Sequence, residues 1–201
     1  MSKEKVFGMT LKPGPIALGI DQSLTGFALT ALNVDAPEQY ETWVYKSDKR
    51  GVARLADIQW WLQNKFEYIQ KYGQITEIAM EGTVLASQSA LVLGELAATV
   101  KLACWHYFDI HAMSIQDYPE NLRVPLQIPP MTLKKYAAGK GNAKKQEMLM
   151  QIFKRWGIEF NDDNAADSYA LARLASGAAL GTIEEAILEQ IKDPKYRDSV
   201  A

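Results

Sequence analysis

The chain has 201 residues, of which 48% are hydrophobic and 23% are charged, and its formal net charge is −2. This length suits one domain with a sizeable core, and the near-neutral charge excludes a global electrostatic case for nucleic-acid binding. A single cysteine, Cys104, excludes an internal disulfide framework and a cysteine-based zinc site.

No targeting segment is expected. Met1 to Lys12 is polar and basic, unlike a secretion signal. No apolar run reaches the ~20 residues of a membrane-spanning helix. We therefore expect a protein without membrane contact in a reducing compartment.

The first part of the chain predicts three antiparallel strands after an irregular lead at residues 1–14. Ile16 to Asp21 is almost continuously apolar, as in a strand covered on both faces. Its alternation places Gly19 on the same face as Asp21, so that face carries small side chains that allow close approach. Phe27 to Leu32 and Tyr40 to Tyr45 follow after short links, which indicates a meander.

The middle of the chain alternates helix and strand. Apolar residues recur at three- and four-residue steps from Val52 to Ile69, which predicts an amphipathic helix. Ile75 to Glu81 predicts a strand, and the helical crossover before it implies that this strand is parallel to a neighbour. A second helical stripe runs from Leu93 to Cys104.

The remainder predicts an insertion, a short strand and three helices. Residues 109–121 are expected to be an insertion, and residues 193–201 a frayed tail. The expected elements between them are a strand at Val124 to Ile128 and helices at Asn142 to Trp156, Asp163 to Leu180 and Thr182 to Lys192. The whole order is that of an α/β, ribonuclease H-like fold in a single domain, 1–201. Its mixed five-stranded sheet has three antiparallel strands followed by parallel ones, flanked by helices.

Two acids stand at strand ends. Asp21 closes the first strand and Glu81 closes the fourth. If these strands are parallel neighbours, both carboxyl groups emerge at one sheet edge, where sites in open α/β sheets lie. Each acid also has a simpler interpretation, because Asp21 could form a turn and Glu81 could be a solvated strand end.

Further acids open the long C-terminal helix. Asp163 and Asp167 are four residues apart and share a helix face with Asn164, whereas Asp162 does not. Capping of the helix by Asp162 or Asp163 is the simpler alternative. Crowded carboxylates raise one another's pKa, and divalent cations remove that penalty, so an oxygen-only acidic site suits Mg²⁺ or Mn²⁺.

A basic segment precedes that helix. Five lysines fall within a dozen residues that contain no acid: Lys134, Lys135, Lys140, Lys144 and Lys145. Gly139 and Gly141 would let the backbone approach a phosphate, and Asn142 could cap the next helix. A solvated loop is the alternative, but a phosphate-binding role fits a segment beside an acidic metal site.

These segments resemble the RuvC family of Holliday junction resolvases over roughly residues 16 to 176. Four motifs carry the resemblance in order: Leu18-Gly-Ile-Asp21-Gln-Ser-Leu-Thr-Gly26-Phe; Ala79-Met-Glu81 followed by Ser89 to Gly94; Lys134 through Gly139, Gly141, Ala143 and Lys145; and Asp163-Asn-Ala-Ala-Asp167-Ser-Tyr-Ala-Leu-Ala172. The short chain with an insertion near residues 109–121 looks more like a phage version.

The resemblance implies a ribonuclease H-like fold, a homodimer and two Mg²⁺ ions, for which Mn²⁺ can substitute. It makes Asp21, Glu81 and Asp167 metal ligands. It also makes Lys134 and Lys145 phosphate contacts and places Ser89 in the DNA-binding region.

The chain departs from the family pattern at two places. The family usually has Asp, sometimes His, where Asn164 stands, so either Asn164 ligates through its amide oxygen or Asp163 does so instead; we favour Asp163. The family often has an aromatic residue shortly after the second acid, where this chain has Thr83, Val84 and Leu85. Cleavage preference could therefore differ.

The expected activity is a Mg²⁺-dependent endonuclease that hydrolyses DNA at four-way junctions by a two-metal mechanism. Its expected setting is recombination and repair, or phage DNA processing, in the cytoplasm of a bacterial or phage-infected cell. Two alternatives stay open. One is a nuclease with another substrate, such as flaps, other branched DNA or RNA–DNA hybrids. The other, suggested by Asn164, is an inactive junction-binding module.

Overall fold

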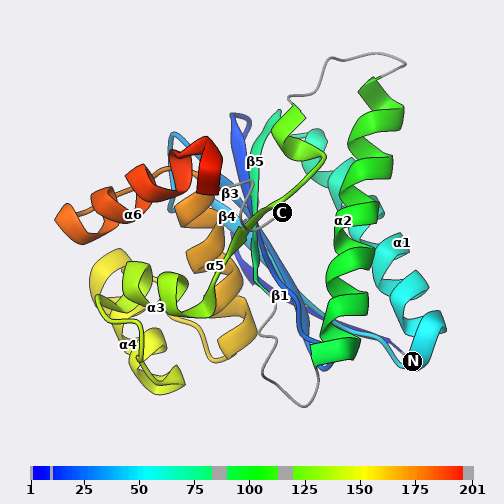
Figure 1. Ribbon diagram of the computed structural model, residues 1–201, viewed down its shortest axis with the longest axis horizontal. Helices are drawn as coiled ribbons and strands as arrows, with labels where there is room; N and C mark the ends of the chain where they lie inside the picture. Colours follow the sequence, from blue (N-terminus) through cyan, green and yellow to red (C-terminus); the bar gives the residue numbers. More distant parts are fainter. Residues whose placement is uncertain (1, 10, 83–89, 113–119, 197–201) are drawn as a thin grey trace.

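The structure, a computed structural model, describes residues 2–9, 11–82, 90–112 and 120–196. These residues form one mixed sheet with helices on both faces (Figure 1). The strands are β1 (Lys3–Gly8), β2 (Ile16–Asp21), β3 (Phe27–Asn33), β4 (Tyr40–Lys46), β5 (Ile75–Glu81) and β6 (Leu126–Ile128). The helices are α1 (Gly51–Gln70), α2 (Ala90–Ala112), the short 3-10 turn η1 (Glu120–Leu122), α3 (Pro130–Ala138), α4 (Lys145–Trp156), α5 (Asp163–Ala175) and α6 (Thr182–Lys192).

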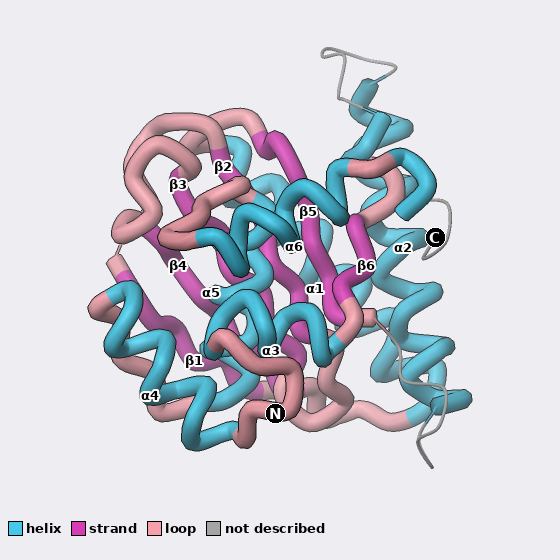
Figure 2. The backbone as a smooth tube through the Cα atoms, turned by 60° about the vertical axis from the view of Figure 1, so that its left-hand side comes forward, coloured by secondary structure: helices cyan, strands magenta, loops and turns pink. Residues whose placement is uncertain are grey.

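The strand order across the sheet is β1-β4-β3-β2-β5-β6 (Figure 2). β1, β4, β3 and β2 pair antiparallel, whereas β2, β5 and β6 are parallel. The five strands β4-β3-β2-β5-β6 form the expected sheet, in which three antiparallel strands are followed by parallel ones. The condition set in the sequence analysis is met: β2 and β5 are parallel neighbours, so Asp21 and Glu81 leave adjacent strands at the same end of the sheet.

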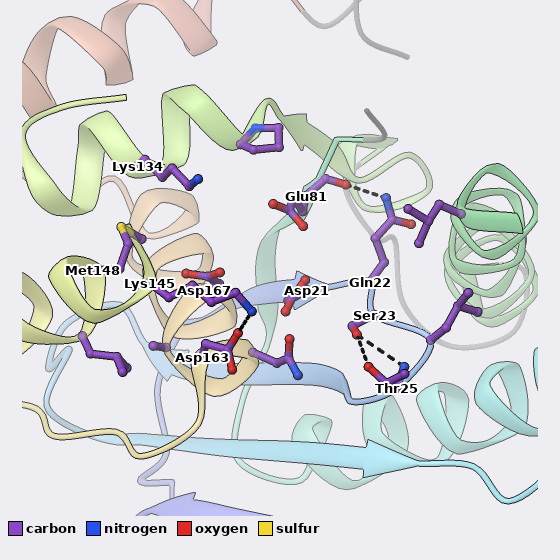
Figure 3. Close-up of a pocket in the computed structure, with 16 residues that line it drawn as sticks. Asp21, Gln22, Ser23, Thr25, Glu81, Lys134, Lys145, Met148, Asp163 and Asp167 are labelled. Atoms are coloured by element: carbon purple, nitrogen blue, oxygen red, sulfur yellow. Dashed lines mark hydrogen bonds and ion pairs between the residues drawn. The ribbon is translucent and has the colours of Figure 1, made fainter. Parts of the chain in front are cut away.

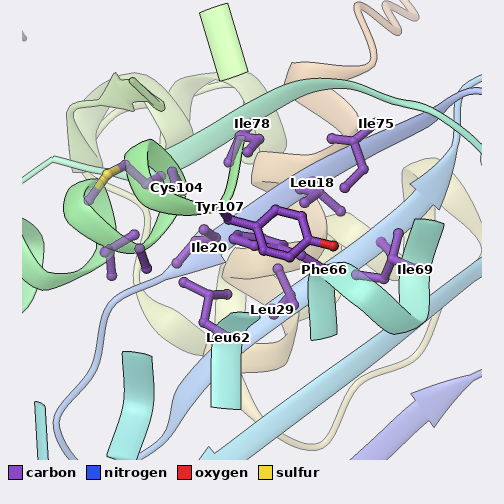
Figure 4. Packing of buried hydrophobic residues seen from close by; sticks show 14 of the residues in the cluster. Leu18, Ile20, Leu29, Leu62, Phe66, Ile69, Ile75, Ile78, Cys104 and Tyr107 are labelled. Atoms are coloured by element: carbon purple, nitrogen blue, oxygen red, sulfur yellow. The ribbon is translucent and has the colours of Figure 1, made fainter. Parts of the chain in front are cut away.

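Two apolar layers sandwich the sheet. On one face α1 and α2 cover the face of β2 that carries Leu18 and Ile20, and Figure 4 shows these two side chains packed among Leu62, Phe66 and Tyr107. On the other face lies α5, joined by α3, α4 and α6 (Figure 1). Among the described helices, none has the length and apolar composition that crossing a bilayer would require.

The approach of α5 to β2 depends on a glycine. A Cβ atom at Gly19 would overlap the α5 backbone at Ser168 and Ala172, so this position admits only hydrogen. Hydroxyl groups then fix the helix on the sheet, because Thr30 Oγ1 lies 2.8 Å from Ser168 Oγ and 2.7 Å from Thr42 Oγ1. All three hydroxyl residues are buried, so these bonds satisfy groups that would be costly to leave unpaired.

The sheet has six strands rather than the expected five. The additional strand, β1, lies within residues 1–14, which we expected to be an irregular lead. It pairs with β4 along its full length, from Lys3 opposite Lys46 to Gly8 opposite Glu41. The strand was missed because it is an exposed edge strand with charged residues in its first half, and so it lacks the apolar run of a covered strand.

Several boundaries in the second half also differ from expectation. Pro130 starts helix α3 in a segment where no helix was expected, because proline suits the first turn of a helix. The helix α2 continues to residue 112, into the start of the expected insertion, and residues 113–119 lie outside the described residues. At the expected frayed tail, Tyr196 donates a hydrogen bond to the Gln127 backbone oxygen at 3.2 Å.

Candidate functional site

The first two acids are brought together by the parallel pairing of β2 with β5. Ile20 pairs with Met80, and the next residues, Asp21 and Glu81, extend from the ends of their strands. Beyond this pairing, Gln22 Nε2 donates a hydrogen bond to the Glu81 backbone oxygen at 2.7 Å (Figure 3). The side chain of Gln22 therefore continues the connection between the two strands past the end of the ladder.

The N-terminus of α5 supplies the other candidate ligands. Asp162 caps the helix, since its carboxylate accepts a hydrogen bond from the backbone N–H of Ala165. Asp163, Asn164 and Asp167 line the same pocket as Asp21 and Glu81 (Figure 3). The simpler interpretation of the capping residue is thus correct for Asp162, and Asp163 faces the pocket.

A glycine positions Asn164 as well. A Cβ at Gly26 would lie 2.6 Å from Asn164 Nδ2 and 3.4 Å from a Val44 methyl group. Gly26 therefore provides the space in which the Asn164 amide packs at the start of β3. The amide lines the pocket next to Asp163, so both residues proposed for the fourth ligand position are available there.

The pocket has a volume of about 460 Å³. Its wall includes residues that the motif-based reasoning did not assign: Gln22, Ser23, Leu24, Thr25, Leu93, Pro130, Met148, Leu149 and Ala166. Ser23 Oγ lies 3.2 Å from Thr25 Oγ1, so these hydroxyl groups interact within the turn after β2. The sequence could have indicated part of this pocket wall, because Gln22 to Thr25 directly follow Asp21 in the chain. No comparable signal marked Met148 or Leu149.

Burial has the largest effect on the pKa values of the three buried acids in the pocket, Asp21, Glu81 and Asp167. Burial, followed by the negative charges of Glu81 and Asp167, raises the pKa of Asp21 well above its ordinary value. Burial also raises the pKa of Glu81, opposed by its hydrogen bond with Asp21 and by the charges of Lys134 and Lys145. Both carboxyl groups therefore ionise less readily than a solvated acid would.

The two acids of α5 differ from each other. Burial, with the charges of Glu81 and Asp163, raises the pKa of Asp167 to about 7. Asp163 is more exposed and forms an ion pair with Lys145 (Figure 3), and this hydrogen bond lowers the pKa of the Asp163 carboxyl. Asp163 is therefore ionised at neutral pH, whereas Asp21 and Asp167 lose their protons less readily.

The donor chemistry of the pocket fits a divalent cation. Its candidate ligands are all oxygen atoms, and burial, followed by the charges of neighbouring carboxylates, raises the pKa values of Asp21 and Asp167. A divalent cation would favour their ionised forms. Within the described part of the chain, the acids line an open pocket and no three of them close into a compact metal-binding group.

The basic segment is a helical hairpin rather than a loop. Lys134 in α3 and Lys145 at the start of α4 line the pocket. The other three lysines of the cluster, Lys135, Lys140 and Lys144, are exposed and do not line it. Lys140 forms an ion pair with Glu147 at 2.7 Å.

The expected cap of α4 is corrected by the structure. Its N-cap residue is Lys144, not Asn142, because the chain makes a further turn before the helix starts. Ser89 and the positions of the missing aromatic residue, Thr83 to Leu85, lie outside the described residues.

Comparison with known proteins identifies the fold. No protein-family model and no curated protein matches the sequence. Two solved structures match with a TM-score of 0.56: Thermus thermophilus RuvC, 19% identical, and T. thermophilus RuvC in complex with a Holliday junction substrate, 18% identical. The first alignment covers 88% of this chain and 96% of the RuvC chain, and the second covers 88% and 95%. The chain therefore has the ribonuclease H-like fold of RuvC.

Proposed function

We propose that this protein is a divalent-cation-dependent endonuclease that cleaves four-way DNA junctions. The observation that carries the proposal is the convergence of Asp21, Glu81, Asp163 and Asp167 into one pocket of a RuvC-like fold. Two lysines at the same pocket, Lys134 and Lys145, supply positive charge for a phosphate. A structural relative is solved with a Holliday junction substrate, which favours the junction among branched DNAs.

Mg²⁺ is the proposed cofactor, with two ions per site. We assign Asp21, Glu81 and Asp167 as ligands, with Asp163 as the fourth because its carboxyl is ionised at neutral pH; Asn164 offers an amide oxygen beside it. When bound, Mg²⁺ or Mn²⁺ supplies activation of a water molecule and stabilises charge on the leaving oxygen of the phosphodiester.

The protein side chains prepare the site for this reaction. Lys134 and Lys145 attract the phosphate and offset part of the repulsion between it and the acids. The Gln22 amide holds the Glu81 backbone in place, and so keeps the ends of β2 and β5 together. The ion pair of Lys145 with Asp163 has to rearrange if Asp163 binds an ion while Lys145 binds a phosphate.

We also propose that the protein acts as a homodimer. On α2, Leu91, Leu102 and Trp105 share one helix stripe and remain 80%, 52% and 46% exposed. An exposed apolar stripe on a long helix favours burial against a partner. A second copy of this chain would give a symmetric pair of sites, which matches the two strands of like polarity in a four-way junction.

A second candidate function is an inactive junction-binding module. Asn164 in place of an acid, together with the Lys145–Asp163 ion pair, favours this candidate because both lower the negative charge available to a cation. A nuclease with a broader range of branched DNA or with hybrid substrates is the other alternative. For either nuclease, the proposed setting is DNA recombination, repair or phage DNA processing in the cytoplasm of a bacterial or phage-infected cell.

Cleavage tests separate these candidates. Purified protein is incubated with an immobile four-way junction, a flap, a fork and an RNA–DNA hybrid, each with Mg²⁺ or EDTA. Cleavage of the junction above all, and only with the ion, supports the proposal. Binding of the junction without cleavage in Mg²⁺ or Mn²⁺ supports the inactive module instead.

A further inference from the structure

The edge strand β1 carries lysines on the same side of the sheet as α5. Glu4 of this strand contacts α1, because its carboxylate accepts hydrogen bonds from Trp61 Nε1 at 2.6 Å and from Lys65 Nζ at 3.0 Å. Successive side chains of a strand alternate between faces, so Lys3 and Lys5 lie on the opposite, α5 side. Lys46 of β4 lies there too, because it is directly opposite Lys3.

Lys3 and Lys46 form a pair of like charges. Side chains directly opposite in an antiparallel pair are about 5 Å apart at Cβ, and like charges there are destabilising. Both lysines are exposed, and neither forms an ion pair with any residue in the described part of the chain. Within the described residues no ion pair offsets the charge of either lysine, although the Asp48 carboxylate lies close to β1, where it accepts a hydrogen bond from Ser2 Oγ at 3.0 Å.

Lys3 and Lys46 lie at the same end of the strands as the candidate site. Tyr45 is paired with Phe27, where β3 begins next to the Asp21 turn, and Lys46 is one residue further along β4.

Lys5 connects the pair to the pocket. Its Nζ lies 3.3 Å from Asp162 Oδ2, and Asp162 caps α5 just before the pocket residues Asp163 and Asn164. Lys5 is also opposite Val44, whose methyl group lies near Gly26 beside the Asn164 amide. The three lysines thus begin directly next to the pocket and extend from it along β1 and the end of β4.

We propose that Lys3, Lys5 and Lys46, the edge-strand lysines, form a second phosphate-binding surface for DNA that continues beyond the cleavage pocket. This inference rests on the proposed function. Lys134 and Lys145 lie at the pocket on the α3–α4 side, whereas the edge-strand lysines lie past the Asp162 end of α5, so positive charge flanks the acids on two sides. A nucleic-acid backbone fits this layout because its charges repeat along its length, unlike those of a single small anion.

Replacing the unpaired lysines tests the proposal. The variant K3Q/K46Q removes two charges and leaves Lys5 and its contact with Asp162 in place. The matched control, K12Q/K71Q, removes two exposed lysines at the opposite end of the sheet, near Gly14 and Gly73. Binding is measured in EDTA, over a range of salt concentrations, to a four-way junction with long duplex arms and to a short single strand that spans only the pocket.

The expected result is selective for the long DNA. K3Q/K46Q should bind the junction about tenfold more weakly than the control variant, and the slope of log affinity against log salt should fall by about 2. Binding of the short strand should be the same for both variants. Meanwhile the thermal midpoint of K3Q/K46Q should equal or exceed that of the wild type, because the substitution removes cross-strand repulsion.

Other results overturn the inference in distinguishable ways. Equal junction binding by K3Q/K46Q and K12Q/K71Q, while the wild type binds well, refutes the second surface and leaves the proposed function standing. Equal weakening on long and short DNA also refutes it, because the lysines would then act at the pocket. Absence of DNA binding by the wild-type protein refutes the proposed function itself.

Discussion

Asp21 and Glu81 leave two parallel strands side by side, one residue beyond the pairing of Ile20 with Met80. Burial raises the pKa of both carboxyl groups, which share a hydrogen bond. The fold therefore holds two acids together at a place where their charge is poorly solvated. A divalent cation bound between the two carboxylates would stabilise their ionised forms and so offset the cost of burying them.

The first prediction concerns the contact between α5 and β2. Gly19→Ala places a methyl group against the α5 backbone and should lower the free energy of unfolding by about 3 kcal/mol or more. The matched control is Gly94→Ala in α2, where a Cβ meets nothing within 4 Å; it should be neutral or raise stability by about 0.5–1 kcal/mol. Chemical denaturation of both variants measures this. Equal stability of the two would mean that α5 does not approach β2 as closely as described.

A second prediction uses a carboxylate away from the pocket. Burial raises the pKa of Asp57, but hydrogen bonds from Lys49, Ser47 and Tyr45 outweigh that effect and lower the pKa to about 2. A lowered folded-state pKa stabilises the fold above the unfolded value, near 4, and this contribution disappears as pH falls to about 2. Asp57→Asn should therefore lose about 2 kcal/mol at pH 7.

Measuring the free energy of unfolding at a series of pH values checks the prediction for Asp57. The stability difference between wild type and Asp57→Asn should shrink between about pH 4 and pH 2, whereas Glu189→Gln, at an exposed position, should show little difference throughout. A difference for Asp57→Asn that stays constant down to pH 2 would contradict the assigned hydrogen bonds.

The third prediction concerns cation binding. The pKa of Asp167 is raised to about 7, so a cation that binds this carboxylate must displace a proton at lower pH. Mn²⁺ affinity, followed by the electron paramagnetic resonance signal of the free ion, should rise by up to about tenfold per pH unit below about pH 7, where the Asp167 carboxyl still binds a proton. Asp167→Asn should bind Mn²⁺ weakly with a shallower pH dependence. Affinity that is independent of pH in the wild type would remove Asp167 from the ligand set.

The fourth prediction tests the homodimer. Leu102→Glu places a charge in the exposed apolar stripe of α2 and should convert the protein from dimer to monomer in sedimentation experiments. The control is Val52→Glu, because Val52 is 81% exposed on α1, outside that stripe; this variant should stay dimeric. A wild-type protein that sediments as a monomer at the concentrations used for cleavage would contradict the proposed assembly.

Much of the site could be predicted because its acids follow local patterns. An apolar run that ends in Asp21 or Glu81 marks a covered strand and its end, and the spacing of Asp163 and Asp167 places them on one helix face. The helical crossover before the fourth expected strand predicted that this strand is parallel to a neighbour, but it did not identify β2 as that neighbour. These inferences depend on short-range sequence and on general rules of chain connection.

The missed features depend on contacts between distant residues. The strand β1 is defined by its pairing with β4, some forty residues away, and its exposed lysines gave no apolar pattern. The ion pair of Lys145 with Asp163 and the hydrogen bond from Gln22 to Glu81 likewise depend on how separate elements meet. The helix α3 was missed for a different reason: its first residue, Pro130, suits the first turn of a helix, but this local signal was not used in the prediction from sequence.

The central claim is that the acids of this pocket bind divalent ions to cut a four-way junction, and one gel experiment tests it. An immobile junction is incubated with wild-type protein or Asp21→Asn, with Mg²⁺ or EDTA. We predict paired nicks that leave 5′ phosphates with the wild type in Mg²⁺, and no cleavage in EDTA. Asp21→Asn should bind the junction but leave it intact. Cleavage by Asp21→Asn at a rate near that of the wild type, or equal cleavage in EDTA, would contradict the account.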